Sequence, residues 1–172
     1  RKQTFQRVSS AQDKQKTQIS KEMPMAKPSS VEFWLLKLAL VEESRTDWLE
    51  SCLDLQWVIH KGIREILQQQ FVLFAENKST SFPDLLNALP SESYKKLATE
   101  AVAEGRSIPN PERQLNDIVL RLRNQFIDSR LGEIQRELVS NAADESRWPE
   151  LIAERDELKK LMSHPLEPLA GT

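Results

Sequence analysis

The sequence predicts an all-α protein, made of a compact helical bundle followed by a long helix that ends in a protruding antiparallel helical hairpin. Only four of the 172 residues are Gly, and the chain is rich in Leu, Glu, Gln, Lys and Arg, which lose little freedom in helices. Apolar residues recur with the helical period in most segments between residues 30 and 163. Prolines and short polar stretches separate these segments, as in helical bundles.

Residues 1–29 are expected to form a flexible basic linker. Residues 1–30 hold seven Lys and Arg and two Asp and Glu, a net charge of +5, with Pro24 and Pro28 near the end. They contain too few large apolar residues to form a core. The whole chain carries a charge of −2, so the remainder carries −7. An acidic body is a poor surface for phosphates, and we expect the folded part to meet protein, with no direct contact to nucleic acid.

The bundle is expected over residues 30–126. Ser30 is expected to cap its first helix, whose sequence, VEFWLLKLALVEE, is apolar nearly all round and therefore belongs at the centre. The next segment, SRTDWLESCLDLQW, reads as a short helix and turn. Three more helices are expected in HKGIREILQQQFVLF, FPDLLNALP and SESYKKLATEAV, with Pro83 and Pro90 as breaks.

A long helix is expected to begin at Pro111, with Asn110 as its cap. Its apolar residues form two stripes, about 100 to 160° apart around the axis. The first stripe contains Leu115, Ile118, Val119, Leu122 and Phe126, and the second contains Leu120, Ile127, Leu131, Ile134 and Leu138. One flat partner could not cover both stripes, so the helix is expected to pack into the bundle with its first half and into another body with its second half.

That other body is expected to be a hairpin over residues 127–163, followed by a tail over residues 164–172. Ser146 or Asp144 can cap the last helix, and Pro149 is tolerated in its first turn. Trp148, Leu151, Leu158 and Met162 share one side of this helix and are expected to pack on the second stripe of the long helix.

No catalytic constellation, cofactor motif or metal-ligand pattern is recognisable in the sequence. The glycines are isolated, so a phosphate-binding loop is not expected. His60 and His164 are the only histidines and Cys52 is the only cysteine; we expect the histidines at the surface or at helix ends. Basic residues of the long helix, Arg121, Arg123, Arg130 and Arg136, alternate with acids and are expected to form a solvated, ion-paired face. Gly132 is expected to give flexibility, to allow close approach of a partner, or to be tolerated at the surface.

The order of these parts resembles the C-terminal helicase-binding domain of bacterial DNA primase (DnaG), from about residue 30 to residue 162. The resemblance rests on VEFWLLKLALVEE, DLQWVIHKGIREIL, LNDIVLRLRNQFIDSRLGEIQREL and ELIAERDELKKLM in this order. It implies a non-catalytic domain that docks on the N-terminal domains of the hexameric replicative helicase, DnaB. The zinc-binding and primer-synthesising modules of the primase would precede residue 1.

The resemblance implies that the hairpin is the main docking element. The expected partner-binding residues are Arg130, Glu133, Arg136, Glu137, Trp148, Ile152, Arg155 and Leu161. Ile152 and Leu161 flank the predicted seam and are available to a partner, or they simply widen the seam. The resemblance implies a bacterial cytoplasmic protein, and no signal peptide or membrane span is recognisable. As an adaptor, the chain is expected to be monomeric alone. Two alternatives remain: the N-terminal domain of the helicase itself, and an unrelated scaffold that homodimerises through the hairpin.

Overall fold

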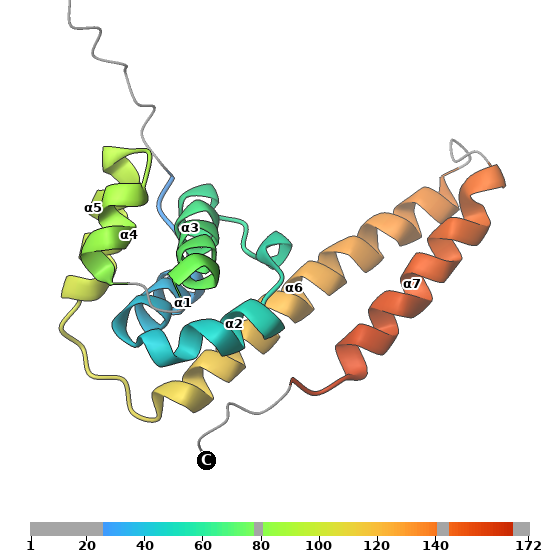
Figure 1. The fold of residues 1–172 in the computed structure, drawn as a ribbon. Coiled ribbons are helices and arrows are strands. Elements are labelled where there is room, and N and C mark those ends of the chain that lie inside the picture. Colours follow the sequence, from blue (N-terminus) through green and yellow to red (C-terminus); the bar gives the residue numbers. More distant parts are fainter. Residues whose placement is uncertain (1–25, 78–80, 141–144, 167–172) are drawn as a thin grey trace, which may run out of the picture.

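The structure, a computed structural model, describes residues 26–77, 81–140 and 145–166, and within these ranges it is all-helical (Figure 1). The predicted all-α class is therefore confirmed. The helices are α1 (Ser30–Val41), α2 (Thr46–Cys52), α3 (Lys61–Asn77), α4 (Phe82–Ala88), α5 (Glu92–Ala103), α6 (Pro111–Val139) and α7 (Trp148–Ser163), with single 3-10 turns at Glu43–Arg45, Leu55–Trp57 and Glu145–Arg147.

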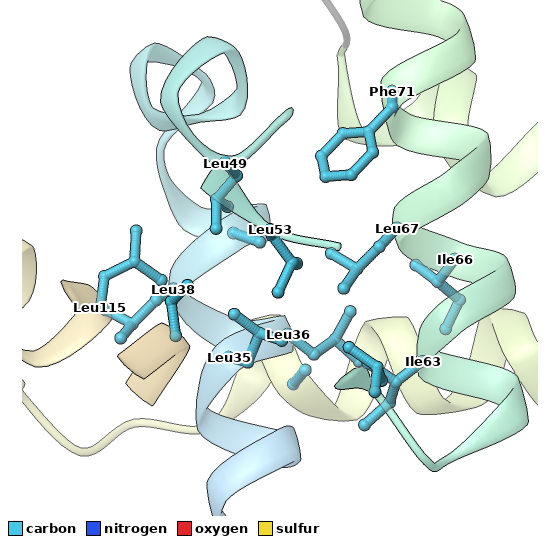
Figure 2. Close-up of a cluster of buried hydrophobic side chains, with 14 of the residues drawn as sticks. Leu35, Leu36, Leu38, Leu49, Leu53, Ile63, Ile66, Leu67, Phe71 and Leu115 are labelled. Carbon is cyan, nitrogen blue, oxygen red and sulfur yellow. The ribbon is translucent and has the colours of Figure 1, made fainter. Parts of the chain in front are cut away.

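Helix α1 lies at the centre of the part formed by α1 to α5 and the beginning of α6. It contacts α3, α5 and α6, and Leu35, Leu36 and Ala39 are fully buried. Figure 2 shows leucines of α1 converging with side chains of α2 and α3. A helix that is apolar nearly all round has no face to offer to water, which explains its central position.

The N-terminus of α1 differs from the prediction in one residue. Ser29, not Ser30, is the cap, and it forms a reciprocal capping box with Glu32. Glu32 also accepts a hydrogen bond from the backbone N–H of His60, at 2.7 Å. Burial tends to raise the pKa of Glu32, but hydrogen bonds from His60, Ser29 and Ile59 outweigh it and lower the pKa below its ordinary value of 4.5.

His60 is buried and directly precedes α3, so of the two expected positions, at the surface or at a helix end, it occupies the helix end. Its Nδ1 accepts a hydrogen bond from the backbone N–H of Ile63, in the first turn of α3. Its Nε2 lies 2.6 Å from the carbonyl oxygen of Ala26. The imidazole therefore joins the start of α3 to the segment before α1, and Ala26, within the predicted linker of residues 1–29, contacts the bundle. Residues 1–25 lie outside the described part of the chain.

Helix α6 contributes to two separate groups of buried residues. Leu115, Val119 and Leu122 belong to the main core, whereas Ile127 and Ile134, about 100° further round the axis, are buried outside it, on the half of α6 that packs against α7. Asn110 precedes the helix in a left-handed conformation, with φ of 49°, and its side chain makes no capping hydrogen bond, contrary to the prediction. The following Pro111 disfavours the right-handed helical conformation at this position.

Helices α6 and α7 pack against each other and extend away from α1 to α5 (Figure 1). Leu151 of α7 is buried, whereas Leu158 and Met162 are half-buried and Trp148 is exposed. Arg147 occupies the cap position of α7 without a side-chain capping bond; the predicted caps were Ser146, which lies in the preceding 3-10 turn, and Asp144, which lies outside the described residues. No helix in the described ranges is long and apolar enough to cross a membrane.

Candidate protein interface

One side of the hairpin formed by α6 and α7 is covered by ion pairs, and we call Arg130, Glu133, Glu137 and Glu154 the ion-paired face. Arg130 donates from Nε and Nη2 to the two carboxylate oxygens of Glu154, at 2.6 and 2.9 Å. Its Nη1 lies 3.0 Å from Glu133 and 3.7 Å from Glu137, and Glu137 also pairs with Arg147. A guanidinium shared in this way joins α6 to α7 and leaves few free charges on this side.

Hydrogen bonding within the ion-paired face changes the acidity of its members. The hydrogen bond from Arg130 lowers the pKa of Glu154 below its ordinary value, and burial opposes this only in part. Hydrogen bonds to Glu154 and Glu133 in turn raise the pKa of Arg130. These groups stabilise one another in their charged forms.

The opposite side of the hairpin carries apolar side chains, and we call Leu131, Leu138, Val139, Trp148 and Ile152 the apolar face. By helical geometry, Ile152 lies about 160° from Glu154 around the axis of α7. Trp148 and Ile152 are 40% and 41% exposed and lie one turn apart, and Val139 is 71% exposed. Leu131 and Leu138 are half-buried at the edge of the contact between the helices. Four of the eight exposed large apolar residues of the described chain lie on the hairpin.

Leu161, the fourth of these, does not belong to the apolar face. It lies about 180° from Ile152 around α7, and it lines a crevice between the hairpin and the bundle together with Leu53, Trp57, Arg123 and Leu166. The exposed 38% of Leu161 therefore faces this crevice, next to the bundle. Ile152 and Leu161 flank the seam as predicted, but they face different surroundings.

Arg123, predicted to be solvated, is buried beside this crevice. Its Nη1 donates to the carbonyl oxygen of His164 at 2.8 Å, and its Nη2 donates to that of Met162 at 3.3 Å. These carbonyls belong to the end of α7, where helical partners are missing, and a cation is favourable at the negative end of the helix dipole. Leu166 continues the contact by packing against the main core, so the predicted tail begins with residues that bind the bundle.

The two remaining predicted interface residues, Arg136 and Arg155, lie on different sides of the hairpin. Arg136 donates to the backbone carbonyl of Gly132, at 3.1 Å, on the side of α6 away from α7. Arg155 pairs with Asp156 at the edge of the apolar face. The eight predicted residues therefore do not form one surface: Trp148 and Ile152, with Arg155 beside them, are the members on the apolar face. A Cβ atom at position 132 would have no neighbour within 4 Å, so no other described part of the chain packs closely against Gly132.

Leu131, Leu138 and Val139 complete the apolar face, and none of the three was among the predicted interface residues. The signal that could have found Val139 was its place outside both predicted stripes, in the last turn of α6. Among the described residues, no group of three or more His, Cys, Asp or Glu side chains could hold a metal ion.

Comparison of the chain with family models, with curated proteins and with solved structures found no match.

Proposed function

We propose that this chain is a non-catalytic interaction domain of a bacterial DNA primase. In this proposal it binds the hexameric replicative helicase and couples primer synthesis to the unwinding of the fork. The family resemblance described above supplies the identity of the partner, and the geometry of the hairpin supplies the docking surface, which is the apolar face.

The observation that carries the proposal is the exposure of Trp148 and Ile152 on a projecting pair of helices. A two-helix hairpin buries few residues, here chiefly Ile127, Ile134 and Leu151, so an apolar residue on its outer side finds no cover within the hairpin. Neighbouring apolar residues that stay exposed mark interaction surfaces more often than isolated ones. Aromatic anchors such as Trp are enriched among the residues that dominate binding energy.

Measured binding to a replicative helicase from the same genome tests the proposal. The variant Ile152→Glu should weaken binding by about 2 kcal/mol, or about 30-fold, because a charge would enter a desolvated contact. Trp148→Ala should weaken binding by a similar amount. Thermal unfolding of both variants should stay close to that of the wild type, since neither side chain is buried.

Three controls separate docking from stability. Val72→Glu places the same charge on α3 at an equally exposed apolar residue (43% against 41% for Ile152) and should leave binding unchanged. Leu151→Glu buries a charge in the seam and should unfold the hairpin first. Leu161→Glu alters the opposite side of α7 and should weaken binding less than Ile152→Glu. Binding that is lost with Val72→Glu and kept with Ile152→Glu would place the docking surface on the bundle.

A homodimeric scaffold is the second candidate function, because the apolar face could also be covered by another protein chain of the same kind. A scaffold of this kind would self-associate and would not bind the helicase. If the helicase shows no binding to the wild-type chain at any tested concentration, the primase proposal is wrong and the scaffold becomes the favoured function.

A further inference from the structure

We infer that the apolar face also pairs with a second copy of this chain, so that two hairpins form a four-helix bundle about a two-fold axis parallel to the helices. This departs from the expected monomer. The pairing itself does not depend on the proposed function. Its consequence does rest on the proposed function: a dimer would hide the docking face, so the helicase and the second copy would compete for it.

The antiparallel register of α6 and α7 follows from two contacts. Arg130 of α6 is level with Glu154 of α7, and Arg123 is level with Met162. At 1.5 Å rise per residue, this register brings Asp128 of α6 to a level between Arg155 and Lys159 of α7. It also brings the levels of Leu131 and Leu138 next to those of Ile152 and Trp148, near the far end of the hairpin.

The same geometry sets the directions of the charged side chains. Asp128 lies about 160° from Arg130 around α6, and Lys159 lies about 140° from Glu154 around α7. Both are exposed, and both point to the side of the apolar face. Within the described part of the chain, neither Asp128 nor Lys159 takes part in a salt bridge, in contrast to the acids of the ion-paired face.

A two-fold axis parallel to the hairpin places α6 of one copy opposite α7 of the other at the same level. Asp128 of each copy then faces Lys159 of the other copy, and this pair occurs twice. Leu131 and Leu138 of each copy face Ile152 and Trp148 of the other. Every pair of neighbouring helices is antiparallel, as in four-helix bundles. A two-fold axis perpendicular to the hairpin would instead place Trp148 and Ile152 of one copy opposite Asp128 and Lys159 of the other. The positions of the charged residues therefore favour the parallel axis.

Charge complementarity favours this occupant because Asp128 and Lys159, on the side of the apolar face, place opposite charges in matched positions. A self-complementary patch is what a two-fold interface requires. The ion-paired face lacks this property, since its charges are already neutralised within the chain.

Sedimentation equilibrium of the whole chain over a wide concentration range tests the pairing. The wild type should show a reversible monomer–dimer equilibrium, Ile152→Glu should remain monomeric, and the bundle control Val72→Glu should dimerise like the wild type. A wild type that stays monomeric up to the highest soluble concentration overturns the inference, whatever it does with the helicase. Loss of dimerisation in the Val72→Glu control would assign the contact to the bundle and would also overturn it.

Charge exchange tests the register. Asp128→Lys and Lys159→Asp should each weaken the dimer about tenfold, because each places two like charges opposite each other. The double variant should restore the dimer to near wild-type strength. Lys160→Asp makes the same change of net charge about 100° further round α7 and should have little effect. If the double variant is no better than the single variants, the two-fold arrangement is wrong.

Competition connects the pairing to the proposed function. Added helicase should convert the dimer into a complex that holds one chain per docking site. If the dimer forms and the helicase binds without dissociating it, the two partners use different surfaces and the proposed competition falls. If the dimer forms and the helicase does not bind at all, the proposed function falls while the pairing stands.

Discussion

Arg130 and Glu154 form a two-point ion pair that joins α6 to α7, with N–O distances of 2.6 and 2.9 Å. The two residues are 24 positions apart in the chain, and the pair lies between the buried residues Ile127 and Ile134 along α6. The pair lies on one side of the hairpin, and the exposed apolar side chains of Trp148 and Ile152 lie on the opposite side.

The first prediction concerns the strength of this pair. A double-mutant cycle with Arg130→Gln and Glu154→Gln should give a coupling energy of about 0.5–1 kcal/mol in thermal or denaturant unfolding, since both side chains are partly exposed and water screens their attraction. The coupling should shrink at 1 M salt, where the screening length is about 3 Å. A cycle with Lys96 and Glu100, an exposed pair on α5 at 3.9 Å, should give a smaller value. Equal coupling in the two cycles would contradict the two-point geometry.

The second prediction concerns acid. The folded chain holds the pKa of Glu154 below its ordinary value of 4.5, so the ionised group contributes stability that is present above pH 4.5 and is lost as the pH falls through the lowered pKa. The free energy of unfolding should therefore fall in this range. Glu154→Gln should reduce the slope, whereas Glu157→Gln, an exposed neighbour on α7, should not. An unchanged slope in Glu154→Gln would show that the pair does not contribute.

The third prediction concerns Gly132, in the middle of α6. Gly132→Ala should raise the free energy of unfolding by about 1 kcal/mol, because Ala favours the helix over Gly and its Cβ would meet no atom within 4 Å. Gly132 lies only about 20° from Val139 around α6, at the edge of the apolar face, but one methyl group adds little bulk there, so helicase binding and self-association should change little. Stabilisation accompanied by loss of binding would show that a partner approaches the backbone there.

The sequence predicted the helical class and most buried positions because these depend on local spacing. The two stripes of α6 are an example: Leu115, Val119 and Leu122 are buried in the main core, and Ile127 and Ile134 are buried outside it. A turn of helix repeats every 3.6 residues whatever it packs against, so the side on which an apolar residue lies can be read from its position alone.

The polar contacts could not be predicted in this way because their partners are distant in the chain. His60 bonds to residues 28 and 34 positions away, and Arg123 bonds to residues 39 and 41 positions away. Their burial reflects the capping of helix ends, which depends on how the helices meet. The same holds for the candidate interface: Ile152 and Leu161 look equivalent on a helical projection, but the bundle lies beside only one of them.

The fourth prediction concerns His60. His60→Leu should lower the free energy of unfolding by about 1 kcal/mol, because the N–H of Ile63 in the first turn of α3 loses its acceptor. Amide hydrogen exchange should quicken in residues 61–64 and in residues 26–29, which the imidazole connects. His164→Leu is the matched control at an exposed position and should leave both segments unchanged. Faster exchange in residues 61–64 alone would show that the contact with Ala26 does not hold the N-terminal segment.

The last prediction concerns Arg123, which holds the end of α7 beside the bundle. Arg123→Met keeps an apolar stem in the buried position but removes both donors, so the carbonyls of Met162 and His164 must turn to water. Because the last turn of a helix depends on such partners, amide exchange at the C-terminal end of α7 should quicken several-fold, and the free energy of unfolding should fall by about 1 kcal/mol. Arg121→Met, two positions earlier on the exposed side of α6, should change neither quantity.

Because Trp148 and Ile152 lie at the other end of α7, helicase binding of Arg123→Met should weaken far less than that of Ile152→Glu. A loss of binding as large as that of Ile152→Glu would mean that the partner also contacts the crevice beside Arg123.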